Sequence, residues 1–221
     1  MKIHCINLAR ATERKKRITQ EWVEQRGFEV EFFSAVDRRD VDDGKEMPFI
    51  YDPLATVARI GRQLTSGEIA CATSHALLLK QALAAGAEEI IVLEDDMLPF
   101  GQTSPASVAA AIDVCKVTFP KVGVLLMHEP AGESVSREIR DGINLVRRAP
   151  YGFRFVWLNK RAMQILCHDL ASLMYPADWL WNLRFAPMRQ VAMLESPLGH
   201  HPDEQTYIGN TFRLDQREYV P

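Results

Sequence analysis

Hydrophobic and polar residues alternate along the chain in a way that predicts strands separated by amphipathic helices. The clearest strand is the apolar run at residues 90–93, which precedes three consecutive carboxylates, Glu94, Asp95 and Asp96. An uninterrupted apolar run rich in β-branched residues is typical of a central strand that is buried on both faces. In open α/β sheets, ligands bind just beyond the carboxyl ends of such strands. We therefore expect the three carboxylates to lie at a functional edge of the sheet.

The same patterning assigns elements to the rest of the chain. Thr65 and Glu68 have the spacing of a capping box, which predicts the start of a long helix. Gly27 is expected to end the helix that follows the first strand. The stretch 34–64 is rich in Asp, Arg and Pro and is expected to be an irregular excursion, because loops of that length are usually functional. Strands are expected at 2–8, 29–33, 90–93, 122–127, 153–158 and 190–194, and helices at 12–26, 65–86, 106–118, 160–173 and 177–185.

The alternation of strands and helices predicts an α/β fold with a mostly parallel central sheet. A length of 221 residues fits a single domain over 1–221.

The net charge of −3 argues against nucleic acid as the main partner. Four widely spaced cysteines without a CxxC pair favour reduced thiols. With neither a signal peptide nor an apolar run long enough to span a bilayer, the sequence predicts a cytoplasmic location.

The acidic run has three explanations that the residues alone leave open. It could hold a divalent cation, supply general acid and base groups, or form a solvated turn, because Asp is common in turns. The cation explanation has a clear physical basis, since Mg²⁺ and Mn²⁺ prefer oxygen ligands and often bind through carboxylates plus substrate phosphates. A cation on Asp96 needs further ligands, and the late loop residue His201 could supply an imidazole.

Other candidate residues have both a structural and a functional interpretation. Glu68 is already explained by the capping box, and a helical histidine such as His75 is more often packed than catalytic. Asp178 could cap a short helix or could face a substrate. Arg10 and Arg14 follow the first strand, where cations and a helix N-terminus could meet a diphosphate.

Several of these motifs together resemble glycosyltransferase family 25, the lipooligosaccharide and lipopolysaccharide galactosyltransferase group, which is related to the collagen galactosyltransferases. The central motif is the segment 64–71, Leu-Thr-Ser-Gly-Glu-Ile-Ala-Cys, followed by the pair Ser74-His75. The acidic motif is the segment 92–96, Val-Leu-Glu-Asp-Asp, and the opening is Ile-Asn-Leu at 6–8 with Arg14 and then Ala-Val-Asp at 35–37. The resemblance covers most of the chain.

This resemblance implies a GT-A-like nucleotide-sugar-binding fold and an inverting, divalent-metal-dependent transfer of a hexose. The donor would be a UDP-sugar, typically UDP-galactose, and the acceptor a glycan of lipooligosaccharide, lipopolysaccharide or another surface polysaccharide. Asp96, with His201, would bind Mn²⁺ or Mg²⁺, and Asp178 would deprotonate the acceptor hydroxyl. The residues expected to border the donor are Asn7, Arg14, Asp37, Glu68, Ser74, His75, Glu94 and Asp95.

The sequence departs from the family pattern at three places. Arg38 replaces the glycine expected after Ala-Val-Asp, the residues after His75 include no aromatic, and the basic tail typical of the family is missing from the end of the sequence. At most a peripheral contact with the inner membrane is therefore expected. Two alternatives are a sugar nucleotidyltransferase, which usually has a glycine-rich loop that is missing at 7–11, and a non-catalytic glycan-binding relative, which would not need the acidic run.

Overall fold

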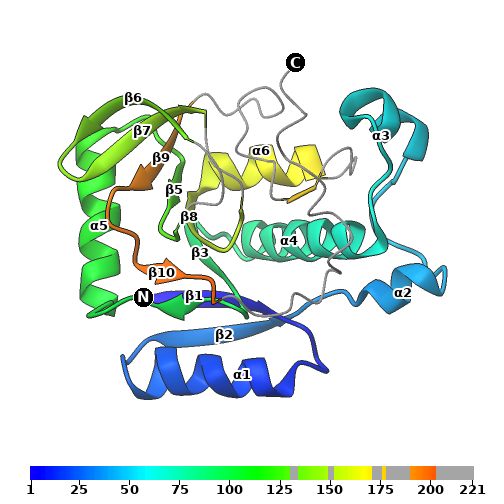
Figure 1. Cartoon of the computed structure of the whole chain (residues 1–221), viewed down its shortest axis with the longest axis horizontal. Coiled ribbons are helices and arrows are strands. Elements are labelled where there is room, and N and C mark those ends of the chain that lie inside the picture. The colour runs from blue at the N-terminus through cyan, green and yellow to red at the C-terminus, as the bar shows by residue number, and fades with distance from the viewer. Residues whose placement is uncertain (130–133, 149–151, 171–175, 178–189, 203–221) are drawn as a thin grey trace.

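A mixed sheet lies between two layers of helices (Figure 1). The computed structural model describes residues 1–129, 134–148, 152–170, 176–177 and 190–202. The strands in this part are β1 (Lys2–Asn7), β2 (Glu29–Ser34), β3 (Glu89–Glu94), β4 (Leu98–Pro99), β5 (Val124–Leu126), β6 (Val135–Arg140), β7 (Ile143–Arg148), β8 (Phe155–Asn159), β9 (Val191–Leu194) and β10 (Gly199–His200). The helices are α1 (Thr12–Ile18), η1 (Thr19–Glu24), α2 (Arg38–Asp42), α3 (Pro53–Ile60), α4 (Ser66–Ala84), α5 (Pro105–Thr118) and α6 (Lys160–Leu170).

The main sheet has the strand order β2-β1-β3-β8-β5-β9-β7-β6. β1 pairs in parallel with β2 and β3, whereas β8 is inserted antiparallel between β3 and β5. β5 and β9 are again parallel, and β9, β7 and β6 follow in antiparallel pairs. Within the described part, only β7 and β8 run against the common direction, so the expectation of a mostly parallel α/β sheet is confirmed. β4 and β10 form a separate antiparallel pair.

The apolar run of β3 is buried on both faces, as its pattern predicts. Ile90 and Val92 face a core that includes α4 and α6, whereas Ile91 and Leu93 face a second core that includes α1, η1 and α5. All four side chains are at most 4% exposed. Each such burial contributes about 1.5–3 kcal/mol, so the strand that carries the acidic run is held firmly in the middle of the sheet.

The helix boundaries follow local signals that the sequence carries. The Thr65 hydroxyl accepts a hydrogen bond from the backbone N–H of Glu68, and the Glu68 carboxylate accepts one from the backbone N–H of Thr65. This reciprocal pair confirms the predicted capping box at the start of α4. The predicted helix 12–26 is present as α1 continued by the π-helical η1, and it ends before Gly27, whose φ of +73° favours glycine.

Two expectations about the chain's irregular parts need correction. The stretch 34–64 contains α2 and α3, whose N-caps are Asp37 and Asp52. The hairpin of β6 and β7 was not predicted, because β6 is mostly exposed and its sequence is largely polar.

Residues 171–173 and 178–185 of two predicted helices lie outside the described residues. None of the described helices is long and apolar enough to cross a membrane.

Candidate functional site

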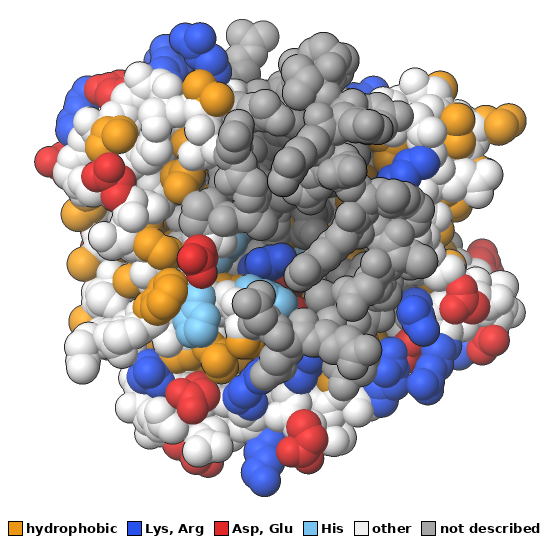
Figure 2. Space-filling view, in the orientation of Figure 1, with side chains coloured by type: hydrophobic (Ala, Val, Ile, Leu, Met, Phe, Trp, Pro, Cys, Tyr) orange, Lys and Arg blue, Asp and Glu red, His pale blue; other side chains and the backbone are white. Residues whose placement is uncertain are grey.

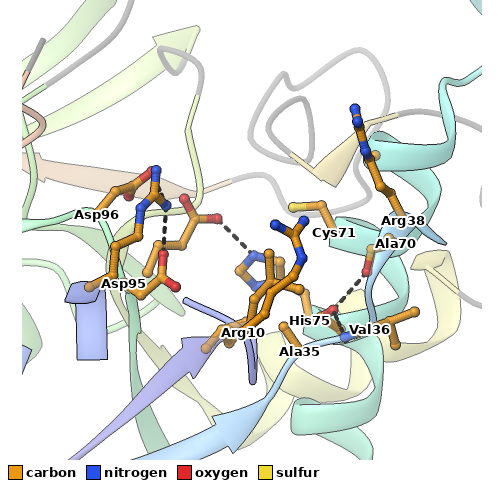
Figure 3. A pocket seen from close by; sticks show the side chains of 15 residues that line it. Arg10, Ala35, Val36, Arg38, Ala70, Cys71, His75, Asp95 and Asp96 are labelled. Carbon is orange, nitrogen blue, oxygen red and sulfur yellow. Dashed lines mark hydrogen bonds and ion pairs between the residues drawn. The ribbon is translucent and has the colours of Figure 1, made fainter. Parts of the chain in front are cut away.

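The carboxyl ends of β1, β2 and β3 meet at a pocket that α4 also lines (Figure 3). Parallel pairing places Asn7 opposite Ser34 and Ile6 opposite Glu94, so the segments that follow the three strands come together. This is the edge at which α/β sheets bind ligands. The lining residues are Ile6, Leu8, Arg10, Arg14, Ala35, Val36, Arg38, Gly67, Ala70, Cys71, Ser74, His75, Glu94, Asp95 and Asp96.

The inner corner of the pocket is Asp95 with its two partners, Arg14, which also lines the pocket, and Asn7, which lies behind Asp95 and is not a lining residue. The Asn7 side-chain amide donates a hydrogen bond to Asp95 Oδ2 at 2.8 Å, and Arg14 Nη1 donates one to Asp95 Oδ1 at 2.8 Å. Burial raises the pKa of the Asp95 carboxyl, although the Arg14 guanidinium acts in the opposite direction. Both carboxylate oxygens are therefore engaged by side chains of the protein itself.

The outer corner is Asp96 with its partner His201, which lies 105 residues later in the chain and is not itself a lining residue of the pocket. His201 Nε2 is 3.2 Å from Asp96 Oδ2, and Arg14 Nη1 is 3.5 Å from the same oxygen. Burial alone would raise the pKa of Asp96, but the His201 hydrogen bond and the charges of Arg14 and Arg154 hold that pKa below its usual value. The other oxygen, Asp96 Oδ1, is buried and has no hydrogen-bond partner among the described residues.

This outer corner fits a divalent cation of the hard, oxygen-binding class. A buried carboxylate oxygen without a hydrogen-bond partner loses the interactions that water would give it, and a bound cation would restore them. Asp96 supplies carboxylate oxygen and His201 supplies imidazole nitrogen, and both are ligand types that bind divalent cations in proteins. The structure therefore brings together the two residues that the sequence predicted as metal ligands.

Glu94 and His75 form a pair between β3 and α4. His75 Nε2 is 3.0 Å from Glu94 Oε1, and the imidazole ring stacks on Phe153 with ring centroids 4.1 Å apart. Burial lowers the pKa of His75 to about 3, so the ring is neutral at physiological pH. A carboxylate only accepts hydrogen bonds, so the imidazole proton of this pair is assigned to Nε2.

Ser74 and Asp37, two of the residues predicted to border the donor, form hydrogen bonds that hold the loop after β2; Ser74 lines the pocket and Asp37 does not. Ser74 Oγ accepts a hydrogen bond from the Val36 backbone N–H at 2.9 Å and donates one to the Ala70 carbonyl at 2.7 Å. The Asp37 carboxylate accepts a hydrogen bond from Arg10 Nε at 2.5 Å, and this contact lowers the pKa of Asp37. These contacts fix the loop against α4 and against the segment that follows β1.

Glu68 does not line the pocket, although its neighbour Gly67 does. Two nitrogens of the Arg62 guanidinium donate to its two carboxylate oxygens, at 2.6 and 2.9 Å. Burial would raise the pKa of Glu68, but Arg62 and the Thr65 backbone N–H together lower it below its ordinary value. Glu68 therefore stabilises the start of α4 and does not face the pocket.

Three arginines, Arg10, Arg14 and Arg38, are among the residues that line the same pocket as the carboxylates, although the Arg38 side chain extends away from them (Figure 3). Figure 2 shows histidine and basic side chains together near the centre of the face seen in Figure 1. Guanidinium groups recognise phosphate oxygens through planar, paired hydrogen bonds. A pocket that combines them with a carboxylate able to bind a cation suits a ligand carrying two adjacent phosphates.

The structure also adds residues that sequence reasoning did not identify. Cys71 and Arg38 line the pocket, Phe153 stacks on His75, and the charge of Arg154 acts on Asp96. Cys71 was visible only as part of a motif. Phe153 and Arg154 precede β8 and reach the pocket because β8 pairs with β3. No local pattern in the sequence predicts that pairing. The candidate base Asp178 lies outside the described residues.

Comparisons with known proteins find similarity to one family of glycosyltransferases. Residues 1–108 match the family model described as glycosyltransferase family 25 (LPS biosynthesis protein). A glycosyltransferase 25 family member from Aedes aegypti is 36% identical over 102 residues, which cover 43% of this chain and 16% of that protein. A member from Drosophila melanogaster is 24% identical over 236 residues, covering 95% of this chain and 37% of that protein. The chain thus spans well under half the length of these relatives.

A solved structure supports the same fold. The chain is similar to a glycosyltransferase involved in the glycosylation of the major capsid of PBCV-1, with a TM-score of 0.52, 13% identity and 93% of both chains covered. At this level of identity the likeness concerns the fold alone. It confirms the predicted GT-A-like α/β arrangement.

Proposed function

We propose that the chain is a member of glycosyltransferase family 25, whose family model matches residues 1–108, and that it moves a hexose from a UDP-sugar to a glycan acceptor. The observation that carries this proposal is the composition of the pocket. Arg10 and Arg14 line the same pocket as Asp96, whose carboxylate pairs with His201. A nucleoside diphosphate carries the charge that such a pocket neutralises, and a neutral glycan does not.

In this proposal, the residues after β1 and β2 bind the donor. Arg10 and Arg14 would approach the diphosphate, while the Asp37 contact with Arg10 fixes the position of that guanidinium. Asn7 keeps Asp95 in place, which in turn orients Arg14. The pair of Glu94 and neutral His75 would face the sugar, because it lies between β3 and α4 along the same pocket.

Asp96 and His201 would hold Mn²⁺ or Mg²⁺ beside the diphosphate. When bound, the ion would stabilise the negative charge that develops on the departing UDP, without the need for a proton donor. Arg14, 3.5 Å from Asp96, would add a fixed positive charge at the same place. This support for the leaving group is the main contribution that the described residues would make to the reaction.

We propose Asp178 as the base that deprotonates the acceptor hydroxyl opposite the leaving group, which gives inversion at the sugar carbon. This role rests on the family resemblance, because residue 178 lies outside the described part of the chain. Replacing Asp178 with Asn is expected to lower transfer at least ~100-fold and to leave UDP binding unchanged. Full transfer by Asp178→Asn, or a product with retained anomeric configuration by NMR, would exclude the role.

The proposed donor is UDP-galactose, and the proposed acceptor is a glycan of lipooligosaccharide, lipopolysaccharide or another surface polysaccharide. The description of the matching family as an LPS biosynthesis protein supports this setting. A cytoplasmic location, with at most peripheral contact with the inner membrane, would place the enzyme beside its nucleotide-sugar pool. Both remain proposals that concern the whole protein.

A donor-hydrolysis screen tests the proposal. UDP release is measured from UDP-galactose, UDP-glucose and their N-acetyl derivatives, with and without Mn²⁺, and then with a deacylated lipooligosaccharide as acceptor. We expect Mn²⁺-dependent UDP release that is fastest from UDP-galactose and increases with acceptor. Pyrophosphate release from UTP and a sugar phosphate would instead identify a nucleotidyltransferase. An absence of UDP release from every donor would contradict the proposed activity.

A further inference from the structure

A second group of metal-ligating side chains lies beside the acidic run, on the α4 side of the pocket. Cys71 and His75 are four residues apart on α4 and therefore share one face of the helix. Glu94 approaches them from the end of β3, and the ligand atoms of the three residues all lie within 4.8 Å of one another. Figure 3 shows the Cys71 sulfur and the His75 ring together on this side of the pocket.

The donor set of this group differs chemically from that of Asp96 and His201. Thiolate, imidazole and carboxylate are the ligands by which proteins bind Zn²⁺, commonly three of them with a fourth position open. Thiolate ligands select zinc-like ions over Mg²⁺ and Mn²⁺, which prefer oxygen. Cys71, His75 and Glu94 all line the pocket, so a fourth position would open into it.

The fold also prepares the imidazole for such a role. The His75 ring is 1% exposed and is fixed by its stacking on Phe153. Its Nε2 points to Glu94, while Nδ1 is buried without a hydrogen-bond partner among the described residues. If Nε2 binds an ion, the ring proton moves to Nδ1, and the hydrogen bond to Glu94 is exchanged for shared coordination. A neutral ring needs no net deprotonation for this exchange.

We propose that Cys71, His75 and Glu94 form a site for a zinc-class divalent cation, separate from the Mn²⁺ or Mg²⁺ position at Asp96 and His201. An ion bound there would occupy the pocket between α4 and β3. Zinc is therefore expected to inhibit the enzyme, a consequence that, unlike the binding itself, rests on the proposed glycosyl transfer.

Cobalt spectroscopy tests the site without any activity measurement. The chelator-treated, reduced full chain is titrated with Co²⁺ in excess Mg²⁺, which fills oxygen-rich sites. We expect the visible bands of a four-coordinate site, a thiolate-to-cobalt charge-transfer band, and loss of both when Zn²⁺ is added. Cys71→Ser should abolish the charge-transfer band and weaken binding at least ~10-fold, because even outer partners of a metal ligand contribute that much. Glu94→Gln should also weaken binding.

Matched variants separate this site from its alternatives. Cys167→Ser, at a partly buried cysteine on α6, should leave the spectrum unchanged, and so should Asp96→Ala. In the wild-type chain, Zn²⁺ but not Mg²⁺ should slow alkylation of Cys71, followed by mass spectrometry, so the test does not depend on variant folding. The proposal is overturned if the charge-transfer band is missing in the wild type or persists in Cys71→Ser, or if Zn²⁺ leaves the alkylation rate unchanged. None of these outcomes depends on whether UDP-sugars are substrates.

Discussion

Asp95 and Asp96 are adjacent in the chain, yet they belong to two corners of the pocket that differ in how their polar atoms are satisfied. In the inner corner, Asn7 and Arg14 donate hydrogen bonds to the two oxygens of Asp95. In the outer corner, His201 contacts one oxygen of Asp96, and the other has no hydrogen-bond partner among the described residues. The difference teaches that an acidic run is not one functional unit. A carboxylate whose two oxygens both accept hydrogen bonds from the protein stabilises the fold, whereas a carboxylate with an unpartnered oxygen can bind a ligand.

Asp96→Ala should produce the largest functional effect. It removes the carboxylate that we propose as a metal ligand, so Mn²⁺-dependent UDP release is expected to fall about 10²–10³-fold, as when one electrostatic contact to the transition state is lost. The free energy of unfolding should change by less than about 1 kcal/mol, because Arg14 keeps its hydrogen bond to Asp95. UDP release and urea denaturation measure the two quantities. If Asp96→Ala lost much stability but kept its activity, Asp96 would be a structural residue and not a metal ligand.

Asp95→Ala is the matched substitution one residue away, and its main effect should be on stability. It leaves the Asn7 amide and the Arg14 guanidinium without their buried acceptor, which should lower the free energy of unfolding by about 2–3 kcal/mol. Urea denaturation of the wild type and of both alanine variants gives the comparison directly. Equal stability losses at Asp95 and Asp96 would show that the two corners do not differ.

Ser74→Ala extends the comparison to another predicted site residue whose polar atom is already satisfied. Loss of the hydroxyl leaves the Val36 backbone N–H without its acceptor and frees the loop after β2 from α4. We expect the free energy of unfolding to fall by about 1–2 kcal/mol, with UDP release reduced less than in Asp96→Ala. Thermal denaturation and the UDP-release assay check both parts. Wild-type stability combined with complete inactivity would instead place the hydroxyl in substrate binding.

Glu68→Gln should give the smallest effect, and its pH dependence identifies the cause. The folded protein lowers the pKa of Glu68 below 4.5, so the carboxylate stabilises the fold above that value. This stabilisation is lost as the pH falls through the lowered pKa. The difference in unfolding free energy between the wild type and Glu68→Gln should be about 1 kcal/mol at pH 7 and should shrink below pH 4.5. A difference that is independent of pH would show that the charge is not responsible.

Local sequence patterns predicted the features that depend on neighbouring residues alone, such as strand burial and helix capping. The β3 run alternates between the two cores as an apolar strand must, and the Thr65 and Glu68 pair caps α4 as its spacing predicts. The association of Asp96 with His201 was also anticipated, because a cation needs ligands from more than one segment. The roles of these side chains remain predictions, but their proximity is observed.

The sequence did not predict features that depend on contacts between distant segments or on short helices. Asp95 cannot be distinguished from Asp96 in the sequence, because the difference arises from Asn7 and Arg14, more than 80 residues earlier. For α3, the signal was present in the Asp52-Pro53 pair, an N-cap followed by proline, but the irregular composition of the whole stretch 34–64 led to the expectation of an excursion without helices. The β6–β7 hairpin forms at an exposed edge, where burial imposes little alternation.

Calorimetry of UDP binding tests the central claim, which is that Asp96 and His201 anchor a metal–diphosphate complex in this pocket. UDP is titrated into the wild type and into Asp96→Ala, each with and without Mn²⁺. We predict that Mn²⁺ tightens UDP binding to the wild type at least ~10-fold, equivalent to about 1.4 kcal/mol, and that Asp96→Ala loses this increment while it stays folded. Equal Mn²⁺-dependent tightening in both proteins would contradict the account.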